Sequence, residues 1–219
     1  MNEAAEPKLA WLLDLGTREY GEVWELQRQL VGQRQRDEIP DTLVLVEHPH
    51  VITLGRGTHK ENILAPGDVP LFEIERGGDV TYHGPGQLVG YPILQLREPD
   101  ERDLHLYLRD LEEALLRTVG AFGITGERKD GWTGVWTGGG ARKLASIGVA
   151  VKKWVTLHGF ALNVSTDLAR FAAINPCGLE ATTMGSMESV LGRSVSFDDV
   201  KREAALQMGA VFARTFVPA

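Results

Sequence analysis

The sequence predicts an α/β or α+β domain in which helices flank a mixed β-sheet. Three helical stretches and two blocks of strand-like segments follow one another in the order helix, strands, helix, strands, helix. Several strand-like segments form hairpin-like pairs, and the regular strand–helix–strand spacing of a doubly wound parallel sheet is missing. With 219 residues, of which 43% are hydrophobic and 24% charged, the chain has the size and composition of one globular domain, residues 1–219.

Apolar residues at helical spacing predict three helices. The first lies in residues 17–38, with Thr17 as a plausible N-cap. The second lies in residues 103–123, where Asp103 can cap the start and Gly123 can end the helix. The third begins at "SFDD" with a capping-box pattern. The residues expected on its buried face are Val200, Ala204, Met208 and Val211.

Runs rich in β-branched and apolar residues predict the strands. The segments before the central helix are "TLVLVEH", "VITLGRG", "LFEIERGG" and "LVGYPILQL", and the first two are joined by a turn at residues 48–50. The segments after it are "TGVWTG", "KLASIGVAVKK" and "VTLHGFALNVS". The last two are expected to form a hairpin that turns at residues 152–154.

Charge and cysteine content exclude several classes of protein. The net charge of −7 disfavours nonspecific nucleic-acid binding. A single cysteine allows no intramolecular disulfide, no spacing suggests structural zinc, and no leader or membrane-spanning run is visible, so the cytoplasm is expected. Residues 128–153 carry six cations against Asp130. That basic segment is either a surface for an acidic partner or a scattered solvated face.

The only cysteine, Cys177, stands in "INPCGLE". The residues of "NPCG" suit a type I turn with the cysteine at its third position, in a backbone region where many active-site residues sit. A lone cysteine can equally be a small buried hydrophobe. A nucleophilic thiol requires activation. The candidates are His83, His158 and Lys143, because a half-buried lysine can act as a general base.

Two glycine-rich segments favour a binding pocket. "RGGDVTYHGPGQ" and "WTGGGARKLASIG" each contain four glycines, which let the backbone approach a ligand closely. Neither segment matches the phosphate-binding P-loop or the dinucleotide-binding glycine pattern, and both can also be read as two loosened hairpin turns. His48, His50 and His59 lack the spacing of a metal site.

Taken together, five stretches resemble the lipoyl(octanoyl) transferase family. They are "HPHVITLGRG", "RGGDVTYHGPGQLVGYPI", "GVWTGGGARKLASIGVAV", "LHGFALNV" and "INPCGLE", in this order between about residues 48 and 180. Related lipoate and biotin ligases share the glycine-rich run, but the combination with the cysteine segment is specific. The resemblance implies the mixed-sheet catalytic domain of biotin and lipoate protein ligases.

The resemblance also implies an activity: octanoate passes from octanoyl-acyl carrier protein to a lysine of lipoyl domains. Those acceptors belong to 2-oxoacid dehydrogenase complexes and to the glycine cleavage H protein. In the family, the cysteine matching Cys177 carries the acyl group and the lysine matching Lys143 is its partner. The family's substrate-binding stretches fall on Arg76, Gly77, Gly78, Asp79, Val80, Thr81, Tyr82, His83, Ser146, Ile147, Gly148, Gly159, Phe160 and Ala161.

This activity needs no metal, ATP or other cofactor, because the thioester is already activated. A monomer that binds neither nucleic acid nor membranes is expected. Two alternatives remain open at this point. One is an ATP-dependent lipoate or biotin ligase on the same fold, which needs no nucleophilic cysteine. The other is a binding module for acyl chains or carrier proteins without catalytic activity.

Overall fold

The computed structural model describes residues 7–97 and 101–219, apart from the side chain of Cys177. Its main feature is an eight-stranded mixed sheet, as the sequence predicts. In spatial order the strands are β11 (Arg214–Pro218), β1 (Lys8–Thr17), β2 (Thr42–Glu47), β6 (Gln87–Ile93), β10 (Val155–Asn163), β9 (Arg142–Lys152), β8 (Trp132–Thr137) and β7 (Glu127–Lys129). β1 pairs in parallel with both β11 and β2, and the other pairs are antiparallel.

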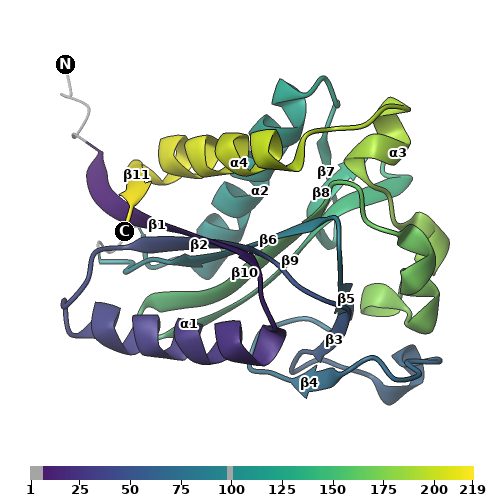
Figure 1. Ribbon diagram of the computed structural model, residues 1–219, viewed down its shortest axis with the longest axis horizontal. Coiled ribbons are helices and arrows are strands. Elements are labelled where there is room, and N and C mark those ends of the chain that lie inside the picture. The colour runs from purple at the N-terminus through teal and green to yellow at the C-terminus, as the bar shows by residue number, and fades with distance from the viewer. Residues whose placement is uncertain (1–6, 98–100) are drawn as a thin grey trace.

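Helices cover both faces of this sheet (Figure 1). The α-helices are α1 (Tyr20–Gln35), α2 (Leu104–Ala121), the short α3 (Met187–Leu191) and α4 (Phe197–Phe212). α1 lies on one face, where Val23 and Leu30 join a core cluster with residues of β2, β6 and β10. α2 and α4 lie on the opposite face and bury Leu111, Leu115 and Met208 in the largest cluster. No helix of the described residues is long and apolar enough to cross a membrane.

A second, three-stranded sheet stands at one end of the molecule (Figure 1). It consists of β4 (Leu71–Glu73), β3 (Val51–Leu54) and β5 (Val80–His83). The turn at residues 48–50 joins β2 to β3, as predicted, but these two strands do not pair with each other. It carries the chain from one sheet to the other, and buried His48 anchors it by hydrogen bonds of Nδ1 to the Arg18 carbonyl and Nε2 to the Tyr91 hydroxyl.

The predicted helices occur with small corrections at their ends. Thr17 is the last residue of β1 and does not cap α1, whose N-cap position is Glu19. Asp103 caps α2 as expected, accepting hydrogen bonds from the amides of His105 and Leu106. Ser196 likewise accepts from the Asp199 amide at the start of α4.

The β9–β10 hairpin also occurs as predicted. It turns through Lys153 and Trp154, which both adopt positive φ and place Val155 opposite Lys152. Strands β1, β7 and β11, and β5 within the first glycine-rich segment, were not predicted.

Short 3₁₀ helices form the segment that follows β10. They are η2 (Leu168–Ala173), η3 (Pro176–Gly178) and η4 (Ala181–Thr183), and a further one, η1 (Lys60–Asn62), follows β3. η3 packs against β5 and η1. The segment that contains Cys177 is thereby brought to the junction of the two sheets.

Candidate active site

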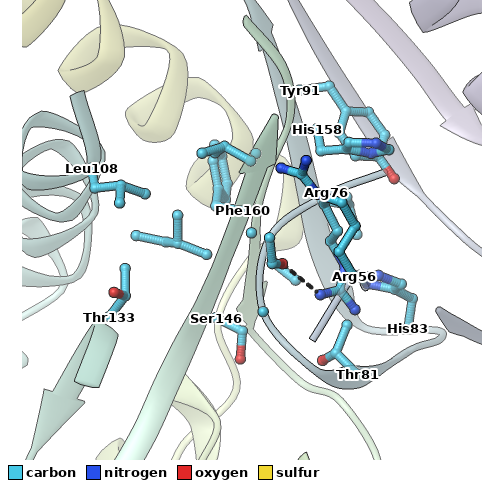
Figure 2. A pocket seen from close by; sticks show the side chains of 18 of the residues that line it. Arg56, Arg76, Thr81, His83, Tyr91, Leu108, Thr133, Ser146, His158 and Phe160 are labelled. Atoms are coloured by element: carbon cyan, nitrogen blue, oxygen red, sulfur yellow. Dashed lines mark hydrogen bonds between the residues drawn. The ribbon is translucent and has the colours of Figure 1, made fainter. Parts of the chain in front are cut away.

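A cavity of about 310 Å³ lies where the first glycine-rich segment meets the β9–β10 pair. Most of the residues predicted to bind substrate line it together with Lys143, although they come from three separate parts of the sequence. Those lining residues are Arg76, Gly77, Gly78, Thr81, His83, Ser146, Ile147, Gly148, Gly159, Phe160 and Ala161. Figure 2 shows ten labelled side chains of this lining.

Three of the predicted residues, Asp79, Val80 and Tyr82, do not line the cavity. Side chains alternate along β5, so Thr81 and His83 face the cavity while Val80 and Tyr82 enter a separate apolar cluster on the other face. Asp79 is buried in a structural role. Its carboxylate accepts hydrogen bonds from its neighbour's amide and from the side chain of Asn62.

The lining residues come from both faces of the β9–β10 pair. Ser146 stands opposite Ala161, on the face that α1 covers, whereas Ile147 stands opposite Phe160, on the face that α2 covers. Figure 2 accordingly shows Leu108 of α2 on one side of the strand that carries Ser146, and His83 on the other.

Lys143 is more deeply buried than the half-buried position expected from the sequence, with 3% of its surface exposed. It stands opposite Trp136 in the β8–β9 register, and its Nζ lies 5.3 Å from the centroid of that ring. The neighbouring strand β8 lies so close to Lys143 that position 134 has to be glycine. At Gly134, where φ is +132°, a Cβ would lie 2.9 Å from Lys143 Cε and 2.3 Å from the Ala145 carbonyl oxygen.

A chain of buried hydrogen bonds connects the glycine-rich segment with the strand of Lys143. Arg76 donates to the Thr53 hydroxyl at 3.0 Å, and that hydroxyl lies 3.5 Å from His83 Nε2. His83 Nδ1 pairs with the Gln87 amide oxygen at 2.7 Å, and Gln87 Nε2 donates to Asn163 at 2.9 Å.

The chain continues to the backbone next to Lys143. Asn163 Nδ2 donates to the Gly185 carbonyl at 3.0 Å, and the Gly185 amide donates to the Lys143 carbonyl at 2.9 Å. A connected network of this kind restrains the side chains that take part in it. It therefore ties one wall of the cavity to the backbone position of Lys143.

The buried histidines around the cavity are neutral at physiological pH. Burial lowers the pKa of His83 to about 3 and the pKa values of His48 and His158 to about 4 each. With a neutral ring, His83 donates from Nδ1 to Gln87, which leaves Nε2 as an acceptor. The structure thus gives His83 the role of a fixed polar group within the wall.

His158 also lines the cavity, and its backbone is strained. Its φ of +59° is rare for a residue with a side chain, and its amide donates to Gln27 Oε1 of α1 at 2.9 Å. Its Nε2 lies 3.5 Å from a carboxylate oxygen of Glu75. The sequence had suggested His158 only as a possible activator of the thiol.

The turn of Cys177 has the predicted backbone hydrogen bond. The Gly178 amide donates to the Asn175 carbonyl at 3.0 Å, and a second bond from Leu179 to Pro176 extends the turn into η3. The side chain of Cys177 is outside the described part of the structure.

Backbone bonds hold this segment on both sides of Cys177. Before it, the Asn175 amide donates to the Asn62 carbonyl at 2.8 Å. After it, Met184 forms a β-bridge with Lys143, seven residues beyond the cysteine. Cys177 is thus carried by a short segment whose end is attached to the strand of Lys143.

Several lining residues were not among those expected. They are Tyr20, Arg56, Val89, Tyr91, Leu104, Leu108, Gly131, Trp132, Thr133, Val149 and His158. Helical spacing places Leu104 and Leu108 on the same side of α2 as Leu111, and Leu108 does pack against the main core cluster, whereas Leu104 remains 43% exposed. No local signal in the sequence distinguishes them from Leu111.

The six cations of residues 128–153 do not form one patch. Arg128 pairs with Glu112 and Glu113, and Lys129 donates to the Gly140 carbonyl. Lys143 faces the cavity, whereas Lys152 stands at the other end of β9, about 30 Å along the strand. The six cations are therefore scattered, although buried Lys143 does not belong to a solvated face. Among the described residues, no group of three or more histidines and acidic side chains could hold a metal ion.

Comparison with known proteins identifies the family. A family model described as the lipoyl protein ligase A/B catalytic domain matches residues 19–209. An octanoyltransferase of Geobacter metallireducens is 52% identical over 192 residues, which is 88% of each chain. An octanoyltransferase of Synechococcus elongatus is 47% identical over 215 residues, covering 95% of this chain and 88% of that one.

The fold agrees with this assignment. The structure of a bi-partite lipoate protein ligase from Thermoplasma acidophilum superposes with a TM-score of 0.75, covering 97% of this chain and 87% of that chain. At 17% identity this likeness concerns the fold alone. By its family model and its identity to curated enzymes, the chain belongs to the lipoyl protein ligase A/B catalytic domain family and, within it, to the octanoyltransferases.

Proposed function

We propose that this enzyme transfers octanoate from octanoyl-acyl carrier protein to a lysine of a lipoyl domain, with Cys177 as the acyl carrier and Lys143 as its base. Acceptors would be lipoyl domains of 2-oxoacid dehydrogenase complexes and the glycine cleavage H protein. The relatives named octanoyltransferase support the class of reaction. The single cysteine is compatible with the reducing cytoplasm, where we place the reaction.

One observation carries the proposal for the site. Lys143, Gly148 and residues of the first glycine-rich segment line one cavity, and the segment of Cys177 is bonded to the strand of Lys143 at Met184. A deeply buried lysine is a candidate general base for a thiol, because desolvation disfavours the charged form of a lysine amine.

In the proposed first half-reaction, the neutral amine of Lys143 takes the proton of Cys177. The thiolate attacks the carbonyl carbon of the donor, and a tetrahedral oxyanion forms. The carbon–sulfur bond to the prosthetic arm then breaks, and Lys143 returns the proton to the departing thiolate. The product is an octanoyl thioester on Cys177.

In the second half-reaction, the neutral amine of the acceptor lysine attacks this thioester. Lys143 receives a proton from the attacking amine, the Cys177 thiolate departs, and an amide remains on the acceptor. Backbone amides are the proposed donors to both oxyanions. The amide of Gly77 already donates to the Val149 carbonyl and that of Gly178 to Asn175, so we assign the role to the amides of Cys177 and Gly78.

The experiment is intact-mass analysis of the protein after incubation with octanoyl-acyl carrier protein. We expect an added octanoyl group that is absent in Cys177→Ser and that disappears when a lipoyl domain is added. Loss of the adduct must coincide with octanoylation of the lipoyl domain. Retention of the adduct in Cys177→Ser would exclude Cys177 as the carrier.

A parallel incubation distinguishes the two alternatives. An ATP-dependent ligase would modify a lipoyl domain from free octanoate and ATP, and Cys177→Ser would keep that activity. A binding module would retain octanoyl-acyl carrier protein without an adduct or turnover. Either result would contradict the proposed transfer.

A further inference from the structure

An arginine at the rim of the cavity takes no part in the proposed chemistry. Arg56 is exposed, and it lines both the cavity and an adjoining open groove of about 800 Å³. Within residues 7–97 and 101–219, no carboxylate lies within ion-pair distance of its guanidinium. The groove's other arginine, Arg28, differs because Glu25 and Glu75 pair with it and the Trp24 ring lies 3.8 Å from its Cζ.

The backbone of Arg56 is held firmly against the glycine-rich wall. Its amide donates to the Arg76 carbonyl at 3.0 Å, and the next amide, of Gly57, donates to the Gly78 carbonyl at 3.0 Å. The Thr58 amide closes the turn onto the Gly55 carbonyl. The guanidinium therefore extends from a fixed point beside the cavity mouth.

The size of the cavity means that the donor has to extend beyond it. At about 30 Å³ per water-sized group, 310 Å³ holds roughly the ten non-hydrogen atoms of an octanoyl thioester. The remaining prosthetic arm, which ends in a phosphate ester, must then lie outside. The groove that begins at Arg56 offers a path for it.

The wall of this groove is connected to the turn of Cys177. Thr58, Lys60 and Ile63 line the groove. Ile63 forms a β-bridge with Ile174, and the Asn62 carbonyl accepts the Asn175 amide. An arm that leaves a thioester at Cys177 can therefore follow this segment towards Arg56.

The charges of the groove suit one anionic group near Arg56. Its cations are Arg28, Arg56 and Lys60, and its acids are Glu73 and Glu75. Glu75 is engaged by Trp24 Nε1 at 3.0 Å and by Arg28 at 3.7 Å. Of the remaining charges in the groove lining, Arg56 and Lys60 are positive and only Glu73 is negative. The rim therefore keeps a net positive charge.

We propose that Arg56 binds the phosphate group of the donor's prosthetic arm. A guanidinium presents a planar fork of donors that matches phosphate oxygens, and its charge persists at any physiological pH. The inference rests on the proposed function, because it assigns a partner for one end of the same donor. The phosphate is a diester in a carrier protein and a monoester in a free phosphopantetheine thioester.

The test compares three donors: octanoyl-acyl carrier protein, S-octanoyl-phosphopantetheine and S-octanoyl-pantetheine, which lacks phosphate. We expect Arg56→Ala to lower kcat/KM about tenfold on the two phosphate-bearing donors, mainly through KM. On S-octanoyl-pantetheine the loss in kcat/KM should be at least fivefold smaller. On the two phosphate-bearing donors the loss should become smaller at high salt.

Arg36→Ala is the matched control, because it removes the same charge at the far end of α1, about 24 Å from Tyr20 of the cavity. It should leave all three rates unchanged. An equal loss of Arg56→Ala on all three donors, or no loss on the phosphate-bearing ones, would overturn the inference and leave the proposed transfer intact. A wild-type enzyme that accepts none of the donors would overturn both.

Discussion

At the scale of single residues, the burial of Lys143 determines what its substitution does. We expect Lys143→Ala to lower the rate of acyl-enzyme formation by a factor of about 10² to 10⁴, because Lys143 is the general base in the proposed mechanism. Stopped incubations followed by intact-mass analysis measure this rate. Lys152→Ala on the exposed end of the same strand is the control and should react normally. Near-normal acylation of Lys143→Ala would remove it from the proposed pair.

Gly148 provides a second prediction at this scale. A Cβ at this position would lie 2.8 Å from Arg76 Cδ and 3.2 Å from the Gly77 carbonyl oxygen. Gly148→Ala should displace the glycine-rich wall and lower kcat/KM for the octanoyl donor by roughly tenfold or more, as small misplacements in active sites do.

The matched control for Gly148 is Gly120→Ala in α2. A Cβ there meets nothing within 4 Å, and alanine should stabilise the helix by up to about 1 kcal/mol. A normal kcat/KM for Gly148→Ala would mean that the glycine-rich wall can move without affecting the reaction, which would contradict this prediction.

The residues of the site were predictable to different degrees. Glycine content and the family motifs indicated Gly77, Gly148 and Lys143, all of which line the cavity. Asp79 and Tyr82 belong to the same motif but face away from the cavity. Which residues of the motif face the cavity depends on the alternation of side chains along β5. This strand was not predicted, because the glycines around it lower the local β propensity.

At the scale of elements, Glu112 connects α2 with the strands beside Lys143. It is almost fully buried, and its carboxylate accepts from Arg109, from Arg128 and from the amide of Gly134. We expect Glu112→Ala to lower the free energy of unfolding by about 3 kcal/mol, because the Gly134 amide loses its buried acceptor and Arg109 and Arg128 each lose an ion pair. Urea denaturation measures this change.

The neighbouring Glu113 is the control for this prediction. It also pairs with Arg128, and with Arg117, but it is partly exposed. Glu113→Ala should cost less than about 1 kcal/mol, as is usual for pairs at the surface. A similar decrease in the free energy of unfolding for both variants would show that the burial of Glu112 does not increase its contribution to stability.

The elements themselves were predictable where the sequence pattern is local. The α2 cap at Asp103 and the β9–β10 hairpin depend on residues close in the sequence, and both predictions are confirmed. Strands β1 and β11 pair in parallel although about 200 residues separate them, and Pro218 weakens the β pattern of the second. Pairing between distant segments leaves no signal in either one alone.

At the scale of the whole molecule, three neutral buried histidines make the fold sensitive to acid. The folded-state pKa values of His83, His48 and His158, about 3, 4 and 4, lie below the usual 6.5 of an unfolded chain. The unfolded state therefore binds protons first as the pH falls. The stability that these histidines contribute is complete above pH 6.5 and is lost progressively towards pH 4.

Between pH 6 and pH 5 the unfolded state binds up to three more protons than the folded state. Over this range the free energy of unfolding should therefore fall by roughly 3–4 kcal/mol. Urea denaturation across this range measures the slope, and His83→Gln should reduce it by about a third. A wild-type slope near zero would contradict the burial of neutral imidazoles.

The attachment of the segment around Cys177 has a consequence for enzyme engineering. Main-chain hydrogen bonds and bridges, at Asn175 and at Met184, hold this segment on either side of the cysteine. Main-chain groups are the same in every non-proline residue, so a substitution at position 177 keeps the attachment of this segment. Selenocysteine or serine at position 177 would therefore test, on an unchanged backbone, how the reactivity of the nucleophile affects the proposed transfer.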